Sequence, residues 1–339
     1  MKDGICIAGN LIVDKVKKID KYPGEGLFAS ISESSESIGG CAGNTLCDLA
    51  QIDSSIPYTC IGRVGRDDSG EYVIDKLKKY GISTDGVTVS NFSSTAFTDV
   101  MSSTQSGERT FFYCGGANAE FSLEHIDFSL LSCRMLHFGY ALLLDSFDAH
   151  DDEDGTVMAK TLKKIQGMGI KTSIDVVSDS EERCQQIVRH SLKYCNYIII
   201  NEIEAGNITG IPARDKNNML IYDNLQAICN NLFNLGVSKM AVIHMPECGC
   251  AMDKNGDFHI IPSYKIEQSE IKGSVGAGDA FCAGMLYSIY NSWEIEESLK
   301  FANMAAACCL MHENSIDGMK TKDEILKMQM HYKLREKGI

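Results

Sequence analysis

The chain has 339 residues, of which 44% are hydrophobic and 23% charged, and its formal net charge is −14. This composition supports a large buried core. The acidic balance argues against nucleic acid or an anionic membrane surface as a partner, because both attract basic faces. Polar residues and Gly4 interrupt the N-terminal segment MKDGICIAGNLIVDK, so we expect neither a signal peptide nor a membrane span there.

The fourteen cysteines are spread through apolar runs and form no CxxC pair. Cys248 and Cys250 form a CxC, but no second pair follows at the spacing of a zinc site. Buried cysteines of this kind pack as small hydrophobic residues. We therefore expect reduced thiols and a cytoplasmic protein.

The N-terminal part of the chain predicts alternating strands and helices. The apolar run 4–10 predicts a buried strand, and Asn10 and Asp14 stand at its carboxyl end, where open α/β sheets bind their ligands. A glycine pair, Gly39 and Gly40, precedes a predicted helix over 42–52 with Asn44 in its first turn. Asn44 is either a helix cap or an amide that binds ligand hydroxyls beside bare backbone.

Residues 95–114 alternate with period two around a turn at 105–107, which predicts an antiparallel hairpin. The hairpin is too polar for the core of a parallel sheet. We expect a small lid formed by about residues 12–38 and 90–116, and a homodimer through it; a surface ribbon used only for dimer contacts is the alternative. Arg109 in this hairpin either meets a phosphate or carboxylate or is simply solvated.

The C-terminal part continues the strand and helix alternation. Strands are predicted over 171–176, 197–200 and 239–244, and a hairpin over 250–253 and 257–262. The strand 197–200 ends in NEIEA, which places Asn201 and Glu204 three residues apart. We find no repeat and no long linker, so residues 1–339 are expected to form one α/β domain.

The most informative stretch is IKGSVGAGDAFCAGMLYSI, residues 271–289. A glycine-rich turn leads into a helical pattern whose first turn carries Asp279. The exposed backbone N–H groups of such a helix start bind anions, and a carboxylate beside them can take a proton from a hydroxyl. An ordinary loop-to-helix junction with Asp279 as a first-turn acid is the alternative.

Four motifs occur in order over nearly the whole chain: GGCAGN (39–44), VGRDDSG (64–70), NEIEA (201–205) and GSVGAGDAF (273–281). Together they resemble the ribokinase-like (PfkB) family of carbohydrate and nucleoside kinases. The resemblance implies a central, mostly parallel sheet flanked by helices, with a small β-sheet lid. It also implies ATP-dependent phosphorylation of a hydroxyl on a small sugar or sugar acid. A nucleoside kinase is the alternative, and a catalytically silent sugar-binding protein is less favoured.

The resemblance also implies roles for single residues. Asp279 would be the general base, and the N–H groups of Gly276, Ala277 and Gly278 would form the anion hole. Asn201 and Glu204 would hold Mg²⁺ through its waters. The acceptor would be bound by Asn10, Asp14, Gly39, Gly40, Asn44 and Arg109, and the nucleotide by Asn201, His244, Gly249, Ser274, Gly276, Gly278 and Asn303.

Two segments depart from the pattern of the family. The family usually begins its last motif with Asp-Thr, and this chain has Gly273 and Ser274, which leaves activation by K⁺ open. The segment HMPECG (244–249) replaces a Thr-Leu-Gly pattern near the nucleotide phosphates. The phosphate contact there is therefore expected to be altered or made by backbone alone.

Overall fold

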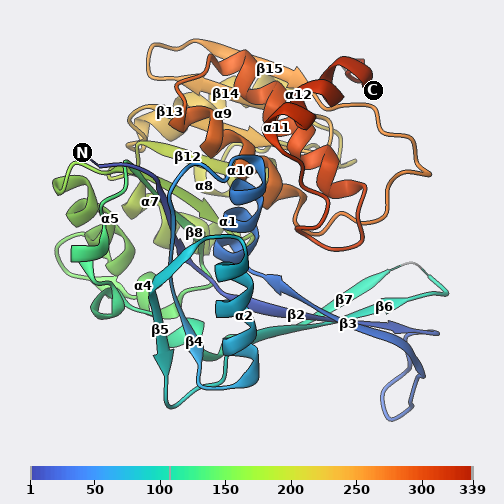
Figure 1. Cartoon of the computed structure of the whole chain (residues 1–339). Coiled ribbons are helices and arrows are strands. Elements are labelled where there is room, and N and C mark those ends of the chain that lie inside the picture. The colour runs from blue at the N-terminus through green and yellow to red at the C-terminus, as the bar shows by residue number, and fades with distance from the viewer. Residues whose placement is uncertain (1, 107, 337–339) are drawn as a thin grey trace.

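The structure, a computed structural model, describes residues 2–106 and 108–336. Its centre is a nine-stranded sheet with the order β15-β14-β13-β12-β11-β8-β1-β4-β5 (Figure 1). The strands from β13 to β5 are parallel, and β14 pairs antiparallel with both β13 and β15. The strands are β1 (Ile5–Gly9), β4 (Tyr58–Gly65), β5 (Ser83–Ser90), β8 (Met135–Ala141), β11 (Lys171–Val176), β12 (Tyr197–Asn201), β13 (Met240–His244), β14 (Cys248–Asp253) and β15 (Phe258–Pro262).

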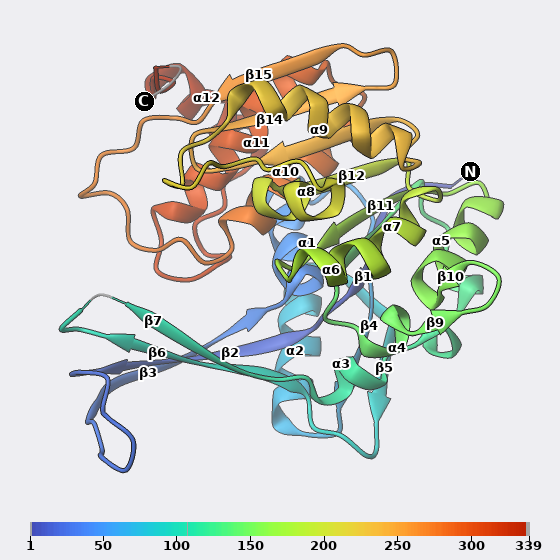
Figure 2. The same ribbon diagram turned by 180° about the vertical axis from the view of Figure 1, so that it is seen from behind.

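Helices cover both faces of this sheet (Figures 1 and 2). One face packs against α1 (Cys41–Ile52), α2 (Asp68–Lys79), α10 (Ala277–Tyr290), α11 (Ile295–Leu310) and α12 (Lys322–His331). The other packs against α3 (Gly116–Glu120), α4 (Asp145–Asp148), α5 (Val157–Gly167), α6 (Glu181–Arg183), α7 (Arg189–Leu192), α8 (Glu202–Thr209) and α9 (Tyr222–Asn234). A π-helical turn, Cys184–Val188, joins α6 to α7, two 3₁₀ turns follow α3 (Leu123–His125 and Phe128–Leu130), and a short ribbon, β9 (His150–Asp151) with β10 (Gly155–Thr156), precedes α5.

Side chains of each buried strand alternate between two hydrophobic clusters. In β1, Ile5 and Ile7 belong to the cluster under α1 and α10, whereas Cys6 and Ala8 belong to the cluster under α5 and α9. A strand that is buried on both faces needs apolar residues at every position, because successive side chains point to opposite sides. The continuous apolar runs of the sequence therefore became central parallel strands.

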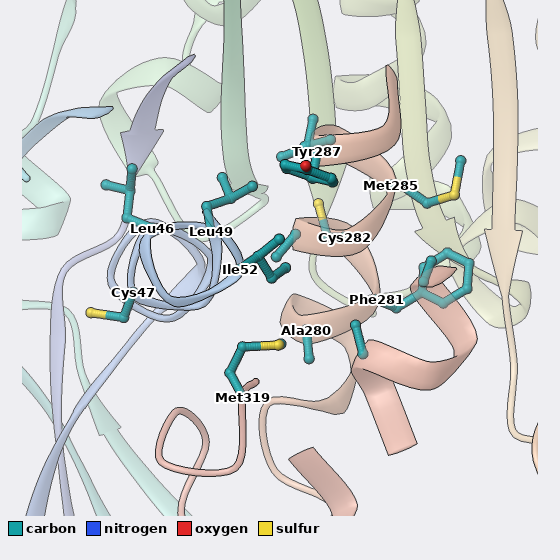
Figure 3. Packing of buried hydrophobic residues seen from close by; sticks show 14 of the residues in the cluster. Leu46, Cys47, Leu49, Ile52, Ala280, Phe281, Cys282, Met285, Tyr287 and Met319 are labelled. Atoms are coloured by element: carbon teal, nitrogen blue, oxygen red, sulfur yellow. The ribbon is translucent and has the colours of Figure 1, made fainter. Parts of the chain in front are cut away.

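Helices α1 and α10 lie side by side over the sheet. Figure 3 shows Leu49 and Ile52 of α1 on the side that faces α10, with Ala280 and Cys282 across from them. This packing brings the first turns of the two helices, which are far apart in the sequence, to the same edge of the sheet.

The small β-sheet expected as a lid is present as a four-stranded sheet that projects from the body (Figures 1 and 2). Its order is β3-β2-β6-β7, with β2 and β6 parallel and the other pairs antiparallel. The predicted hairpin over 95–114 is confirmed, and the polar segment 12–38 forms a second hairpin. The strands are β2 (Ile12–Ile19), β3 (Ile31–Gly39), β6 (Ala96–Ser103) and β7 (Arg109–Cys114).

Across residues 2–106 and 108–336, every helix is too short or too polar to span a membrane.

Candidate active site

Three cavities border the turn that precedes α10. The sheet cavity, about 510 Å³, is walled by the small sheet and by residues near 272–275 and 313–315. The helix cavity, about 450 Å³, is walled largely by α10, α11 and residues 244–246. The central cavity, about 110 Å³, shares Asn201, His244 and Gly278 with the helix cavity. Asp279 lines the central cavity, and Val275, four residues earlier, lines the sheet cavity.

Helix α10 begins at Gly276, whose φ of 85° is the left-handed conformation that glycine adopts without strain. Within the part of the chain that the structure describes, no side chain caps this helix start. Helix α8, by contrast, is capped by Asn201, which accepts hydrogen bonds from two backbone N–H groups. Gly276, Ala277 and Gly278 line the central or the helix cavity, as expected for an anion site at a helix start, and the Ala277 N–H also donates to the Ser274 carbonyl at 3.4 Å.

Asp279 is buried, and its carboxylate accepts hydrogen bonds from two side chains, Asn44 and Tyr140. Asn44 Nδ2 donates to Oδ2 at 2.8 Å, and the Tyr140 hydroxyl lies 3.1 and 3.2 Å from the two carboxylate oxygens. Burial raises the pKa of Asp279 to about 6, and the bonds from Asn44 and Tyr140 oppose this rise. A carboxylate with this pKa is ionised at neutral pH and still a better base than an exposed aspartate.

Asp14 faces Asp279 from the small sheet. Its carboxylate lies against Gly39, where a Cβ atom would overlap it, and it pairs with Thr98. Burial, and to a smaller extent the charge of Asp279, raise the pKa of Asp14 to about 6. Gly39 therefore leaves room for a carboxylate at the floor of the sheet cavity.

Asn10 and Gly40, also predicted to bind the acceptor, contact each other but are not among the residues that line the sheet cavity. Gly40 caps α1 with a φ of 80°, and a Cβ atom there would overlap the carbonyl of Asn10. Asn10 is fully buried, and its Nδ2 donates to the Leu143 carbonyl at 3.0 Å. Its Oδ1 accepts no hydrogen bond from any residue that the structure describes. A buried acceptor without a partner is suited to a ligand hydroxyl.

Asn201 and Glu204 form a reciprocal cap at the start of α8. Asn201 Oδ1 accepts from the N–H groups of Ile203 and Glu204 at 2.9 Å, and the Glu204 carboxylate accepts from the Asn201 N–H and from the Ser178 hydroxyl. Burial raises the pKa of Glu204 to about 7. Both side chains line the central cavity, so the pair lies opposite the start of α10.

The remaining residues predicted to bind nucleotide line the helix cavity, except Gly249. Ser274, His244 and Asn303 line it, and the His244 ring packs on Phe281 with centroids 5.1 Å apart. Gly249 lies behind the wall, because a Cβ there would press on Phe281 and on Asn303 Oδ1.

Arg109 lines the sheet cavity, as do Lys272 and Lys18. Lys18 pairs with Glu33 at 2.7 Å, whereas Arg109 and Lys272 have no ion pair in residues 2–106 and 108–336. Two cationic side chains are thus available at the wall of this cavity.

The comparisons with known proteins agree with this arrangement. The family model of the pfkB family carbohydrate kinases matches residues 4–322. The chain belongs to the pfkB family of carbohydrate kinases. The predicted family, fold class and ATP-dependent sugar kinase activity are therefore confirmed.

Individual pfkB relatives are distant but cover nearly the whole chain. Fructokinase-2 of Oryza sativa subsp. japonica is 22% identical over 330 residues, which is 92% of this chain and 91% of that protein. The structure of Arabidopsis thaliana ribokinase with ribose and ATP superposes with a TM-score of 0.80 at 20% identity, covering 97% and 99% of the two chains. The 2-dehydro-3-deoxygluconokinase of Thermotoga maritima gives 0.77 at 17% identity, with 97% and 99% covered.

Several residues of this pfkB site were not predicted from the sequence. Tyr140 reaches Asp279 from the end of β8, where it has an unusual φ of 56°. Thr98, Asp175 and Lys272 also line the cavities. The only sequence signal for Tyr140 and Asp175 is their place near the carboxyl ends of apolar strands, where open sheets bind ligands.

Proposed function

We propose that this kinase transfers the γ-phosphoryl group of ATP to a hydroxyl of a small sugar or sugar acid, with Asp279 as the general base. The observation that carries the proposal is the position of Asp279. Its carboxylate lies in the first turn of α10, whose start has no side-chain cap, and lines the central cavity, which adjoins the helix cavity assigned to the nucleotide. A base and an anion site at one point are what transfer to an alcohol requires.

The reaction follows from this geometry. The Asp279 carboxylate accepts the proton of the acceptor hydroxyl as the hydroxyl oxygen bonds to the γ-phosphorus. The bond from the γ-phosphorus to the bridging oxygen breaks, so the products are the phosphorylated acceptor and ADP. The N–H groups of Gly276, Ala277 and Gly278 stabilise the charge on the γ-phosphoryl oxygens without moving, because the helix already directs them.

In this proposal Asn201 and Glu204 hold Mg²⁺ through its water molecules. The donor set fits, since a carboxylate and an amide oxygen face the central cavity and oxygen ligands suit Mg²⁺. Asn201 Oδ1 already accepts two N–H groups, which favours contact through water. When bound, the ion neutralises charge on the phosphates.

The nucleotide base would lie in the helix cavity beside Asn303, where Ala306 and Ala307 of α11 leave a flat apolar wall. His244, Ser274 and the backbone near Gly249 would lie toward the phosphates. Burial lowers the pKa of His244 to about 4, so this ring is neutral and contributes packing and a polar atom, not charge.

The acceptor would lie in the sheet cavity, with its hydroxyls bound by Asp14, Asn10 and Asn44 around the bare backbone of Gly39 and Gly40. Arg109 and Lys272 favour an acceptor that also carries a carboxylate, because neither has an ion pair within the described residues. The neutral sugars remain acceptors in this scheme, but with weaker binding.

The chain would work as one domain in which the small sheet acts as a lid over the acceptor. Phe111 lines the sheet cavity, so Phe112, which is 50% exposed, faces the other way. We propose that this outer face pairs two copies. Light scattering on the protein and on Phe112→Lys tests the dimer: an unchanged mass for the variant would overturn it. Thirteen of the fourteen cysteines are buried and Cys114 is half-buried, which supports a reducing, cytoplasmic environment.

The test is acceptor-dependent ADP release with Mg²⁺ across neutral sugars, sugar acids and nucleosides. We expect turnover with a sugar or sugar acid, and a loss of about 10²–10⁴ in Asp279→Asn but none in Asp152→Asn, which changes an exposed loop aspartate. Near-normal turnover of Asp279→Asn would show that Asp279 is not the general base. A response only to nucleosides would replace the proposed acceptor class.

Arg109→Ala separates the acceptor classes. We expect its kcat/KM to fall at least tenfold for a sugar acid and to change little for the matching neutral sugar. Equal losses for both would show that Arg109 does not bind a carboxylate.

A further inference from the structure

A group of thiol, imidazole and carboxylate side chains lies under the central cavity. His137 of β8 is fully buried, and its Nε2 faces two cysteine sulfurs. Cys41 Sγ lies 3.6 Å and Cys282 Sγ 3.7 Å from this nitrogen. Cys41 is the first residue of α1 and Cys282 lies in α10 one turn after the base, so three elements meet at one nitrogen.

Asp175 adds a carboxylate from β11. One of its oxygens, Cys41 Sγ and a ring nitrogen of His137 all lie within 4.8 Å of one another. Because Asp175 lines the central cavity as well, the group has a polar route to the space in which substrates meet.

Cys41, His137 and Asp175 offer three ligand atoms close enough to share one cation, and Cys282 Sγ approaches the same ring nitrogen from α10. The two sulfur–nitrogen distances are those of a tetrahedral metal site. Zinc–sulfur bonds of about 2.3 Å and zinc–nitrogen bonds of about 2.0–2.1 Å, at a tetrahedral angle, separate sulfur from nitrogen by about 3.6 Å. The other ring nitrogen of His137 lies 3.0 Å from the Ser173 hydroxyl. Such a partner orients the ring and directs the Nε2 lone pair at the sulfurs, as partners of metal-binding histidines do.

The contacts of His137 Nε2 also suit a cation. Two thiol sulfurs lie within 3.7 Å of this one nitrogen, which has a single lone pair to give. A single lone pair cannot accept a hydrogen bond from two thiols with full strength, whereas a cation can bind both sulfurs and the nitrogen together.

We propose that Cys41, Cys282, His137 and Asp175 form a binding site for one thiophilic divalent cation, of which Zn²⁺ is the type. Binding replaces the two thiol protons, which are released to solvent, and forms two metal–thiolate bonds. This site is distinct from the water-mediated Mg²⁺ site at Asn201 and Glu204, because sulfur ligands select soft cations and oxygen ligands select hard ones.

The consequence for turnover rests on the proposed function. A cation held by Cys41 and Cys282 would tie α1 to α10 immediately behind the acceptor glycines and the base Asp279. It would also hold Asp175, whose carboxylate lines the central cavity. We therefore expect occupation of the site to slow phosphoryl transfer, at least tenfold at saturation.

Binding is measured without ATP or acceptor, so its result does not depend on the kinase assay. Reduced, chelator-treated protein is titrated with Co²⁺ and followed by absorption. We expect one equivalent to produce thiolate-to-cobalt charge-transfer bands, which Zn²⁺ then abolishes, and Zn²⁺ to raise Tm by a few degrees. Cys282→Ala should lose both effects. Cys195→Ala, which changes a buried cysteine bonded to the Ser191 carbonyl, should keep them.

His137→Gln is the second variant, in case Cys282→Ala does not fold. The absence of charge-transfer bands in the wild type, or equal bands in His137→Gln, would overturn the site. Zn²⁺ binding without any loss of turnover would confirm the site and overturn the link to catalysis. Loss of turnover by Zn²⁺ that persists in both variants would place the inhibitory ion elsewhere and overturn the link in the same way.

Discussion

Asn44 Nδ2 donates a 2.8 Å hydrogen bond to the carboxylate of Asp279, across 235 residues of sequence. The Ser315 hydroxyl donates to Asn44 Oδ1 at 2.9 Å, which fixes the orientation of the amide. The bond joins the first turns of α1 and α10, and both helices begin at glycines with positive φ. This bond therefore fixes the start of α1, which is proposed to bind the acceptor, relative to the proposed base Asp279.

Replacing Asn44 by leucine should reduce the ionised fraction of the base near pH 6 and shift its titration. The hydrogen bond from Asn44 lowers the pKa of Asp279, so its loss raises that pKa and moves the acid limb of kcat/KM to higher pH. A bond to a charged group is worth about 1.5–3 kcal/mol, which corresponds to a loss of about 10–100-fold near pH 6. The pH profile of kcat/KM is the measurement. Gln51→Leu, which removes a bond to the Ile316 carbonyl from the same helix, should leave the profile in place.

The wild-type kcat/KM should fall below about pH 6. The pKa of Asp279 is raised to about 6 by burial, and the base acts only when ionised, so activity is lost as the pH falls through this value. The pKa of Asp14 is also about 6, so a second protonation steepens the fall. In Asp14→Asn the fall of activity near pH 6 should be less steep than in the wild type. An acid limb near pH 4 in the wild type would contradict the burial of the base.

Gly276→Ala should lower turnover about 100-fold. The new Cβ would impose strain at a φ of 85° and meet the Cβ of Ser315 at 2.5 Å, so the N–H groups at the start of α10 would move. Gly81→Ala is the matched control, because its φ is 75° and no atom lies within 4 Å of the new Cβ. Steady-state kinetics and Tm of both variants separate lost activity from backbone strain. Equal turnover in the two variants would show that the turn does not bind the transferred phosphoryl group.

Asp48→Ala should stabilise the protein, and more so at pH 8 than at pH 5. Asp48 is fully buried in α1, and neither carboxylate oxygen has a hydrogen-bond partner in the described chain. Burial raises its pKa well above the ordinary 3.8, so the folded state holds a proton that the unfolded state releases. The free energy of unfolding therefore falls as the pH rises above about 4, until the folded pKa is reached.

Thermal unfolding of wild type and Asp48→Ala at pH 5 and pH 8 measures this effect. Asp75→Ala, at an exposed position of α2, should show no such dependence on pH. A difference in Tm that is the same at both pH values would mean that Asp48 is not the group that titrates.

Local patterns in the sequence predict much of this fold. Apolar runs such as 197–200 specify central strands, because both faces of a parallel sheet must be buried. The alternation over 95–114 specifies a hairpin, and the glycines before Asp279 specify a helix start open to anions. Each of these signals depends on neighbours in the chain, so the family motifs, Asp279 and the pair of Asn201 and Glu204 could be identified without coordinates.

The partners of these residues were decided by tertiary structure alone. The segment 12–38 shows no clear period because β2 and β3 project from the body and need no buried face along their length. Tyr140 reaches Asp279 only because β8 ends beside α10, and Cys41, His137, Asp175 and Cys282 meet only where two helices cross two strands. Contacts between residues more than a hundred positions apart are created by the order of strands in the sheet, which no local pattern encodes.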